Sequence, residues 1–485
     1  MAGKEVDRRD FLKGASAAAA GLALPGLLSG GPDKKSSRPP NVLILFADQW
    51  RFSAFGAGSD PLVRTPNLDR LAREGALCRR TYSAYPLCTP NRSALMTSRY
   101  PHQTGMIRNN LMLPPSEKGF AEIFRDAGYS TLYIGKWHID GPAKPGFVPK
   151  GWRRRGFEKF LGFNRGHSYY RSPTFSDDGV PLRPKGFEPT FQTDLALEFM
   201  KKNRKRPFLC FLSWGPPHMP YDPPRGFRRF FRMKNLEFRP NVPEEARKSP
   251  RIRRMLAGYY GLCEALDREA GRVLSALKEL GLEKNTIVLF TSDHGDMLGS
   301  HGLLYKNHPQ EESLHVPLFV RAPGTIPAGL QVEDLVSTID IAPTLLGLCG
   351  LDPLPRAEGL DLSGRLKGKK GPSREYVYAE GRVASGPGRA AGGRRKRGKR
   401  KGGKQWRALV RGEHKLVLGP GGEVEALYDL SKDPFETKNL AGEKSAAALE
   451  KDLLALARKA AKETGDPFPS PVRPARPRYT KDGKI

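Results

Sequence analysis

The stretch Asn41-Val-Leu-Ile-Leu-Phe-Ala-Asp48 is an apolar run that ends in a carboxylate. An unbroken run of this kind is typical of a strand that is buried on both faces of a parallel sheet. Alternating strands and helices predict an α/β domain around a large, mostly parallel sheet, from about residue 40 to residue 370. The other strand-like runs lie at 130–134, 208–213, 285–291 and 316–320, and the helical patterns at 67–74, 117–127, 193–203, 251–280 and 340–348.

Beyond residue 370 the composition changes. Residues 382–407 contain eleven Lys or Arg and no acid, which predicts a low-complexity surface loop. Residues 406–410 and 414–418 predict a hairpin, and residues 447–463 predict an amphipathic helix. We therefore expect a small C-terminal α+β subdomain and then a basic, Pro-rich tail, at residues 371–466 and 467–485.

The N-terminus carries two adjacent arginines ahead of a short, Ala-rich apolar run. Arg8 and Arg9 precede residues 15–28, a run shorter than the about 20 apolar residues that span a bilayer. This order is typical of a twin-arginine export signal, with a basic start and a small helix as the alternative. We expect the signal at residues 1–31, a polar linker at 32–39, no transmembrane helix, and an exported protein that is periplasmic or extracellular.

The overall charge is the unusual feature of the composition. The 485 residues include 82 Lys or Arg and 51 Asp or Glu, a formal net charge of +31. A hydrophobic content of 38% together with 53 glycines excludes a collagen-like or wholly disordered chain. The five cysteines are too few and too scattered for a disulfide scaffold, and they form no C-x-x-C zinc pair. A balance this basic favours a polyanionic partner.

Polar side chains stand at the ends of two predicted strands. Asp48 and Gln49 follow the first strand, and Asp293 and His294 follow the strand at 285–291. Open α/β sheets bind ligands at the carboxyl ends of their strands. Carboxylate and amide oxygens are the usual ligands of hard divalent cations, so the two strand ends predict a shared metal site.

A cysteine stands at the start of a further predicted helix. A lone cysteine is more often a small buried hydrophobe. Cys88, however, precedes Pro90 by two residues and Arg92 by four. A helix N-terminus and a guanidinium both stabilise anions. We therefore expect an anionic nucleophile or an anionic substrate at this position.

The cysteine motif resembles the signature of type I sulfatases, which belong to the alkaline phosphatase superfamily. The signature is Cys88-x-Pro90-x-Arg92 followed by Leu95-x-Thr97-x-Arg99. The resemblance implies an alkaline-phosphatase-like sandwich around the sheet and an arylsulfatase-like sulfuric ester hydrolase. Further motifs follow in the family order from about residue 41 to residue 440, at 65–72, 135–138, 216–220, 293–295 with Lys306, 311–313 and 427–440.

The resemblance also implies a role for each site residue. Cys88 is expected to be oxidised by a separate formylglycine-generating enzyme to 3-oxoalanine (formylglycine), whose hydrate attacks sulfur and later expels sulfate. One Ca²⁺, with Mn²⁺ or Mg²⁺ as alternatives, is expected on Asp48, Gln49, Cys88, Asp293 and His294. The remaining expected residues are Arg92, which holds the hydrate, Lys136 and Lys306, which clamp sulfate oxygens, His138, which helps to expel sulfate, and His218, which protonates the leaving oxygen.

The sequence departs from the family pattern in two ways. Asn91 stands where the family usually has Ser, and Ser98 where it usually has Gly, while the cysteine, proline and arginine of the motif are intact. The Asp-Gln and Asp-His pairs of the expected metal site differ from the commonest Asp-Asp and Asp-Asn pairs. They keep open an alternative function, a formylglycine-dependent phosphonate monoester or phosphodiester hydrolase.

Charge and export favour a sulfated polysaccharide or oligosaccharide as substrate, and no specific nucleic acid. A third hypothesis is a polyanion-binding protein that grips its ligand through the basic residues 394–401 without catalysis. The pocket walls are expected from the motif-free segments 144–189 and 223–250. His301 and His308 lie near the site in sequence, but no motif gives them a role.

Overall fold

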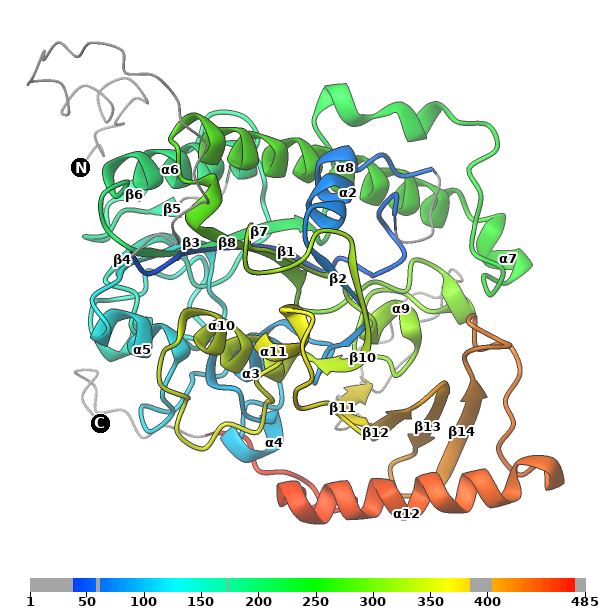
Figure 1. Cartoon of the computed structure of the whole chain (residues 1–485). Coiled ribbons are helices and arrows are strands. Elements are labelled where there is room, and N and C mark those ends of the chain that lie inside the picture. Colours follow the sequence, from blue (N-terminus) through cyan, green and yellow to red (C-terminus); the bar gives the residue numbers. More distant parts are fainter. Residues whose placement is uncertain (1–37, 58–61, 172–173, 384–403, 476–485) are drawn as a thin grey trace, which may run out of the picture.

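The structure is a computed structural model that describes residues 38–57, 62–171, 174–383 and 404–475 (Figure 1). The predicted export signal, most of the linker, the centre of the basic loop and residues 476–485 lie outside the described residues. A ten-stranded sheet forms the centre, in the order β10-β2-β9-β8-β1-β7-β3-β4-β5-β6. These strands are β1 (Asn41–Asp48), β2 (Ala76–Tyr82), β3 (Ser130–Lys136), β4 (Lys159–Phe163), β5 (Thr174–Phe175), β6 (Pro181–Leu182), β7 (Phe208–Pro217), β8 (Thr286–Ser292), β9 (Leu318–Arg321) and β10 (Leu330–Ser337).

The first strand, β1, is buried because it lies in the middle of this sheet. β1 pairs in parallel with β7 on one side and β8 on the other. Its alternate residues point to opposite faces, so Leu43 and Leu45 pack in one core, and Ile44 and Phe46 in the other. All eight residues are buried. The predicted α/β sheet is thus confirmed as mostly parallel, with β9 antiparallel to both of its neighbours.

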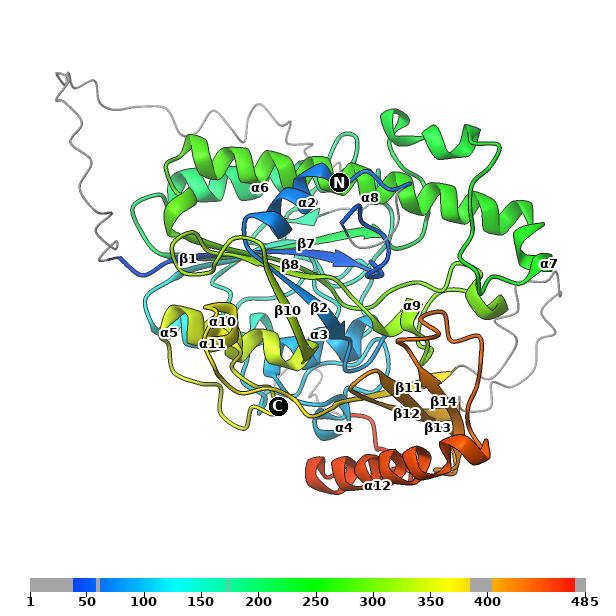
Figure 2. The same ribbon diagram turned by 45° about the vertical axis from the view of Figure 1, so that its right-hand side comes forward.

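Helices cover both faces of the large sheet, as the two-faced burial of β1 requires. Figure 2 shows α2, α6 and α8 on one side and α3, α5, α10 and α11 on the other. The long helix α8 begins where Pro250 takes the first turn and Ser249 caps it. The helices are α2 (Pro66–Arg73), α3 (Cys88–Thr97), α4 (Pro101–Thr104), α5 (Phe120–Asp126), α6 (Glu188–Lys202), α7 (Glu244–Arg247), α8 (Pro250–Glu279), α9 (Glu311–Leu314), α10 (Ile341–Cys349), α11 (Ser363–Leu366) and α12 (Ala447–Thr464).

The C-terminal part forms a second, smaller sheet. Its four antiparallel strands are β11 (Val377–Val383), β12 (Lys404–Arg411), β13 (His414–Leu418) and β14 (Val424–Asp429), with α12 packed along them (Figure 1). The buried ion pair of Arg407 with Asp466 ties β12 to the segment after α12. None of the described helices is long and apolar enough to cross a membrane.

The boundaries predicted for the basic loop are wrong at both ends. Arg382 and Val383 belong to β11, where they pair with Gln405 and Lys404 of β12. Trp406 is buried in the small sheet's core, so the strand begins before the predicted hairpin. Charge composition concealed these strand residues, because Arg382 and Lys404 at the ends of the two strands belong to the same basic run as the loop. Residues 384–403 of the predicted loop lie outside the described part of the chain.

Candidate active site

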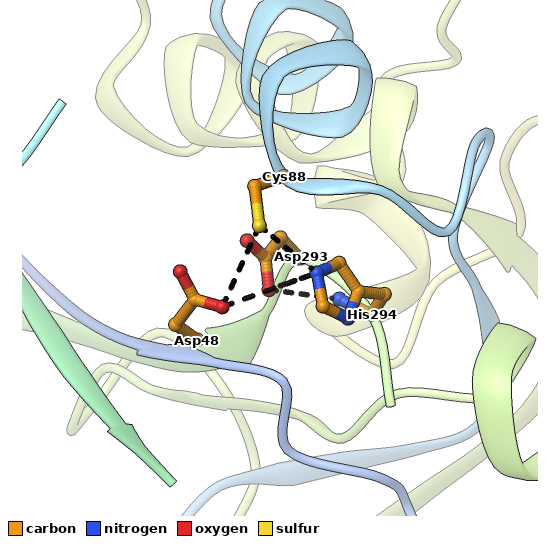
Figure 3. A group of neighbouring side chains, drawn as sticks. All are labelled: Asp48, Cys88, Asp293 and His294. Atoms are coloured by element: carbon orange, nitrogen blue, oxygen red, sulfur yellow. Dashed lines mark hydrogen bonds and ion pairs between the residues drawn. The ribbon is translucent and has the colours of Figure 1, made fainter. Parts of the chain in front are cut away.

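Four side chains from three elements meet at the carboxyl edge of the large sheet. Asp48 ends β1, Asp293 and His294 follow β8, and Cys88 is the first residue of α3. All four are buried, and one potential ligand atom from each lies within 4.8 Å of the others (Figure 3). The Cys88 Sγ is 3.8 Å from Asp48 Oδ1 and 3.4 Å from His294 Nε2. Adjacent parallel strands end at the same edge of a sheet, which is why these groups converge.

The predicted ligand Gln49 lies beside this cluster. Its backbone N–H donates to Asp293 Oδ1 over 3.0 Å, with the backbone in the left-handed region (φ 72°). Its side-chain N–H group donates to Asp296, and its Oε1 accepts from Lys306 Nζ over 2.7 Å. The amide oxygen therefore faces the cluster from the lysine side, and Asp296 fixes the amide plane.

Arg92 holds the two carboxylates together. Its Nη2 donates to Asp48 Oδ2 over 3.0 Å, and its Nε donates to Asp293 Oδ2 over 3.1 Å. A further N–H donates to the backbone carbonyl of Lys136, and the guanidinium lies 4.9 Å from the centroid of the Phe46 ring. Although burial opposes the charge, the two carboxylates raise the pKa of Arg92. Arg92 thus joins the two carboxylates to the end of β3.

Two lysines lie against the cysteine sulfur. Lys306 Nζ is 3.2 Å and Lys136 Nζ is 3.5 Å from Cys88 Sγ. Lys136 also forms a short ion pair with Asp48. Burial and the Asp48 charge act to raise the pKa of the thiol, but the two ammonium groups and His294 outweigh them and lower it to about 5. The pocket is therefore built to hold negative charge at position 88.

The charges of Asp48, Lys136 and Lys306 act on both predicted catalytic histidines. His138 has a positive φ of 62°, and its Nε2 is 3.3 Å from Asn110 Oδ1. His218 turns its Nδ1 toward the backbone carbonyl of Met219, 2.7 Å away. Burial lowers the pKa of both rings, with Lys136 as the next cause for His138 and Lys306 for His218. The Nδ1 contact fixes the His218 ring, and no hydrogen bond joins its Nε2 to another of the described residues.

A profile of the sulfatase family matches residues 40–351. The chain belongs to this family. Its fold and motifs make it a type I sulfatase of the alkaline phosphatase superfamily, as the sequence resemblance implied. A second profile, the twin-arginine translocation pathway signal sequence, matches residues 5–25 and confirms the predicted export signal. The sulfatase is thus an exported enzyme.

Relatives and solved structures agree with this assignment. The sulfatase is 34% identical over 438 residues to the ulvan-active sulfatase of Formosa agariphila, covering 89% of this chain and 83% of that one. It is 33% identical over 372 residues to the endo-4-O-sulfatase of Bacteroides thetaiotaomicron, covering 65% and 70%. The crystal structure of a putative sulfatase from Bacteroides fragilis has a TM-score of 0.76 at 26% identity and covers 92% and 99%.

Sequence reasoning missed one histidine that the sulfatase fold brings to the site. His167 lies in the loop after β4, within the segment expected to form a pocket wall. Its ring stacks on the His218 ring with centroids 3.6 Å apart, and its Nε2 is 3.4 Å from Lys136 Nζ. No motif surrounds it, so only the three-dimensional pairing of this loop with His218 reveals it. Asp296, which follows the same strand end as Asp293, contacts the cluster through the side-chain amide of Gln49.

The two departures from the family motif have structural roles in this sulfatase. Asn91 donates to Ser83 Oγ over 2.6 Å and to Thr338 Oγ1 over 2.9 Å, which ties α3 to the chain after β10. Ser98 ends α3 in the left-handed region at φ 57°, a conformation that favours glycine. Its hydroxyl donates to the backbone carbonyl of Ile339 over 2.8 Å and so stabilises the turn.

The remaining histidines lie outside the catalytic cluster. His301 contacts Asn241 and lies near the carboxylates of Glu312 and Glu436. The backbone N–H of His308 donates to Ser313 Oγ over 3.3 Å. Neither contacts the Cys88 sulfur within the described residues, in agreement with the absence of a motif-based role.

The small sheet reaches the catalytic loop next to Lys306. Asn307 Oδ1 accepts the backbone N–H of Arg382 over 3.2 Å, and the Trp406 indole N–H donates to the Asn307 carbonyl over 3.2 Å. β11 and β12 therefore brace the loop that carries Lys306. The C-terminal sheet of this sulfatase therefore stabilises the loop that places Lys306 beside Cys88.

Proposed function

We propose that this sulfatase hydrolyses sulfate esters of a polysaccharide with formylglycine at position 88 as nucleophile and one divalent cation beside it. The observation that carries the proposal is the environment of Cys88, which lies at the start of α3 between Lys136 and Lys306. A sulfate ester is tetrahedral and anionic, so it repels a nucleophile unless cations neutralise its oxygens. The site supplies these cations around one reactive side chain.

The residues present fit a divalent cation. Asp48 and Asp293 place two buried carboxylates side by side, and burial together with the Asp48 charge raises the pKa of Asp293. Such carboxylates are stabilised by a metal, and the His294 nitrogen and the Gln49 oxygen complete a donor set for Ca²⁺, with Mn²⁺ or Mg²⁺ as alternatives. When bound, the cation supplies Lewis-acid charge that lowers the barrier to attack on sulfur.

The side chains around position 88 would each have a separate role toward the sulfate group. Formylglycine, made by a separate generating enzyme, offers a hydrated aldehyde there in place of the thiol. Lys136 and Lys306 would bind the sulfate oxygens, since their ammonium groups already contact the Cys88 sulfur. Arg92 would act through the metal ligands, because it fixes both carboxylates.

Proton transfer would fall to the two histidines. His218 keeps one proton on Nδ1, which donates to the Met219 carbonyl. We propose that the ring takes a second proton on Nε2 when the anionic substrate is bound, and that this proton passes to the leaving oxygen, which leaves the neutral Nδ1–H ring. His138 lies beside the start of α3, where the Thr89 hydroxyl donates to its backbone carbonyl over 2.7 Å. From there it would hold the hydrate and take up a proton when sulfate is released.

A sulfated glycan is the substrate class that relatives and charge support together. The relatives at 34% and 33% identity are named as an ulvan-active sulfatase and an endo-4-O-sulfatase. The chain is exported and carries a net charge of +31, which attracts polyanions.

The proposal is tested by activity on a panel of sulfated polysaccharides and oligosaccharides, with the enzyme produced in a host that has the maturation enzyme. We expect sulfate release by the wild type and at least about a 10³-fold loss for Cys88→Ala. The Cys78→Ala variant is the matched control, because Cys78 is buried in β2 away from the site. Sulfate release by Cys88→Ala at the wild-type rate would contradict the proposal.

One structural likeness supports a second candidate function. The crystal structure of the phosphonate monoester hydrolase of Agrobacterium radiobacter has a TM-score of 0.70 at 25% identity and covers 88% of this chain and 96% of that one. Parallel assays of an aryl sulfate, an aryl phosphonate monoester and an aryl phosphodiester separate the two. A higher kcat/KM on either phosphorus ester would favour the second function.

A further inference from the structure

The chain between the catalytic His218 and helix α8 forms an unusually basic extension. Residues 221–254 contain eleven Lys or Arg and four acids. In Figure 1 this segment, drawn in green with α7, projects beyond the edge of the large sheet. Two 3₁₀ turns, Arg225–Phe227 and Arg229–Arg232, precede α7, and the segment ends in the first turn of α8. This density of positive charge lies on a segment that begins at the catalytic site.

Five exposed side chains from residues 231–234 and the start of α8 make up what we call the α8 patch. It consists of Phe231, Arg232, Lys234, Arg251 and Arg254. The Arg253 side chain donates to the Lys234 carbonyl over 2.6 Å and so joins residues 231–234 to the first turn of α8. The Arg254 guanidinium lies 6.0 Å from the centroid of the Phe231 ring, and that ring is 38% exposed.

The positive charges of the α8 patch are not neutralised by the protein. Its four basic side chains are exposed, and none of them forms an ion pair with an acid within the described residues. Exposed positive charges without acidic partners attract a polyanion. Guanidinium groups suit this role because they bind the oxygens of a sulfate in pairs.

The α8 patch contacts the loop that carries Lys306. Arg251 Nη2 donates to the Tyr305 hydroxyl over 3.1 Å, and Tyr305 precedes Lys306, which contacts Cys88 Sγ. At the other end, Met219, next to His218, is 41% exposed two residues before the basic segment begins. The patch is thus linked through Arg251 to a loop that supplies one of the two lysines beside Cys88.

We infer that the α8 patch binds sulfate groups of a sulfated polysaccharide beyond the ester that is being cleaved. The inference rests on the proposed glycan substrate and adds where the rest of that chain lies. Arg232, Lys234 and Arg254 contact the neighbouring sulfates, and Phe231 offers a face against which a sugar ring packs. The patch therefore selects long sulfated chains over small sulfate esters.

The test compares a long and a short substrate in a patch variant. The variant carries Arg232→Ser, Lys234→Ser and Arg254→Ser, and leaves Arg251 in place because it touches Tyr305. The matched control removes the same charge with Lys201→Ser, Lys205→Ser and Lys278→Ser. These three exposed lysines precede β7 and β8, so they lie at the opposite edge of the sheet.

For each variant we compare kcat/KM on the best sulfated polysaccharide with kcat/KM on an aryl sulfate. In the patch variant we expect the ratio of these two values to fall at least about ten-fold, because KM for the polysaccharide rises. The control variant should keep the wild-type ratio. An unchanged ratio in the patch variant, an equal fall in the control, or equal losses on both substrates would overturn the inference.

Binding without turnover separates this inference from the proposed function. In the Cys88→Ala background, affinity for the same sulfated polysaccharide is measured with and without the patch substitutions, with polygalacturonate as an unsulfated polyanion. We expect the patch substitutions to weaken binding of the sulfated chain about ten-fold and to change polygalacturonate binding less.

A patch that binds nucleic acid instead would show a larger loss with a DNA duplex than with the sulfated chain, and that result would overturn the inference. If the wild type hydrolyses aryl sulfate but no sulfated polysaccharide, the proposed substrate class fails and not the assignment as a sulfatase.

Discussion

The ring of His167 stacks on the ring of His218, with centroids 3.6 Å apart and planes inclined by 7°. A lysine ammonium only donates, so the contact with Lys136 makes His167 Nε2 an acceptor. A carbonyl only accepts, so the contact with Met219 places a proton on His218 Nδ1. The stack and the carbonyl together fix the plane of His218 and the direction of its Nε2.

Replacing His167 by Ala should impair proton donation more than binding. Without the stacked ring, His218 can turn away from the leaving oxygen, and misplacement of this size reduces the rate by about 10–100-fold. The loss in kcat should be large for a sugar or alkyl sulfate, whose leaving group needs a proton, and small for a nitrophenyl sulfate. His167→Phe keeps a stacking ring and should retain more kcat on the sugar sulfate than His167→Ala. Equal losses on both substrates would show that His167 has no such positioning role.

Replacing Arg92 by Met should cost both stability and activity. The guanidinium compensates the buried charges of Asp48 and Asp293, and removal of one partner of a buried pair costs about 3–5 kcal/mol. Urea unfolding of the variant measures that loss. Arg99→Met is the control, since Arg99 pairs with Glu117 over 2.9 Å away from the catalytic cluster. A stable and active Arg92→Met protein would contradict the arrangement described for the two carboxylates.

Removal of divalent cations should inactivate the enzyme and lower its Tm. At a concentration about 100-fold above Kd, a ligand that binds only the folded state contributes about 2.7 kcal/mol. Activity and melting are measured after chelation and after return of Ca²⁺, Mn²⁺ or Mg²⁺ separately. We expect Ca²⁺ to restore both, and Asp293→Ala to abolish the Ca²⁺-dependent rise in Tm. Full activity of a metal-free preparation would exclude the proposed cation.

Glu188 should make the enzyme less stable as pH rises. Burial raises the pKa of Glu188 from 4.5 to about 8 in the folded protein. Between these values the folded state holds a proton that the unfolded chain has released, so the free energy of unfolding falls with increasing pH across this window. Glu188→Gln removes the titration and should raise stability at pH 7 by about 2–3 kcal/mol, with no gain at pH 4. Urea unfolding at several pH values checks this, and an unchanged slope in the variant would refute it.

Periodicity predicted the large sheet because its central strands are buried on both faces. Asn41–Asp48 and Phe208–Pro217 read as continuous apolar runs, and that pattern has few alternatives. The strand Ala76–Tyr82, which lies between β10 and β9 next to the edge of the sheet, was missed because its apolar run is interrupted by Arg79 and Arg80, which are only partly buried. Edge and hairpin strands carry mixed side chains, so local pattern does not distinguish them from loops.

The site was predictable where residues lie in motifs and unpredictable where they do not. Asp48, Cys88 and Asp293 stand at strand and helix ends, so the topology of the sheet brings them together. His167 comes from a loop whose path depends on packing between β4 and β5, and no local spacing encodes its stack with His218. The contacts of Arg92 with both carboxylates were also not predictable, since they depend on the meeting of α3 with the ends of β1 and β8.

The chemical state of residue 88 tests the account most directly. Trypsin releases residues 81–92 as one peptide that contains Cys88, and mass spectrometry of this peptide from active enzyme reads the side chain. We predict the sulfur-free mass of formylglycine, with specific activity proportional to the converted fraction across preparations. A peptide that keeps its thiol in fully active enzyme would contradict the central claim.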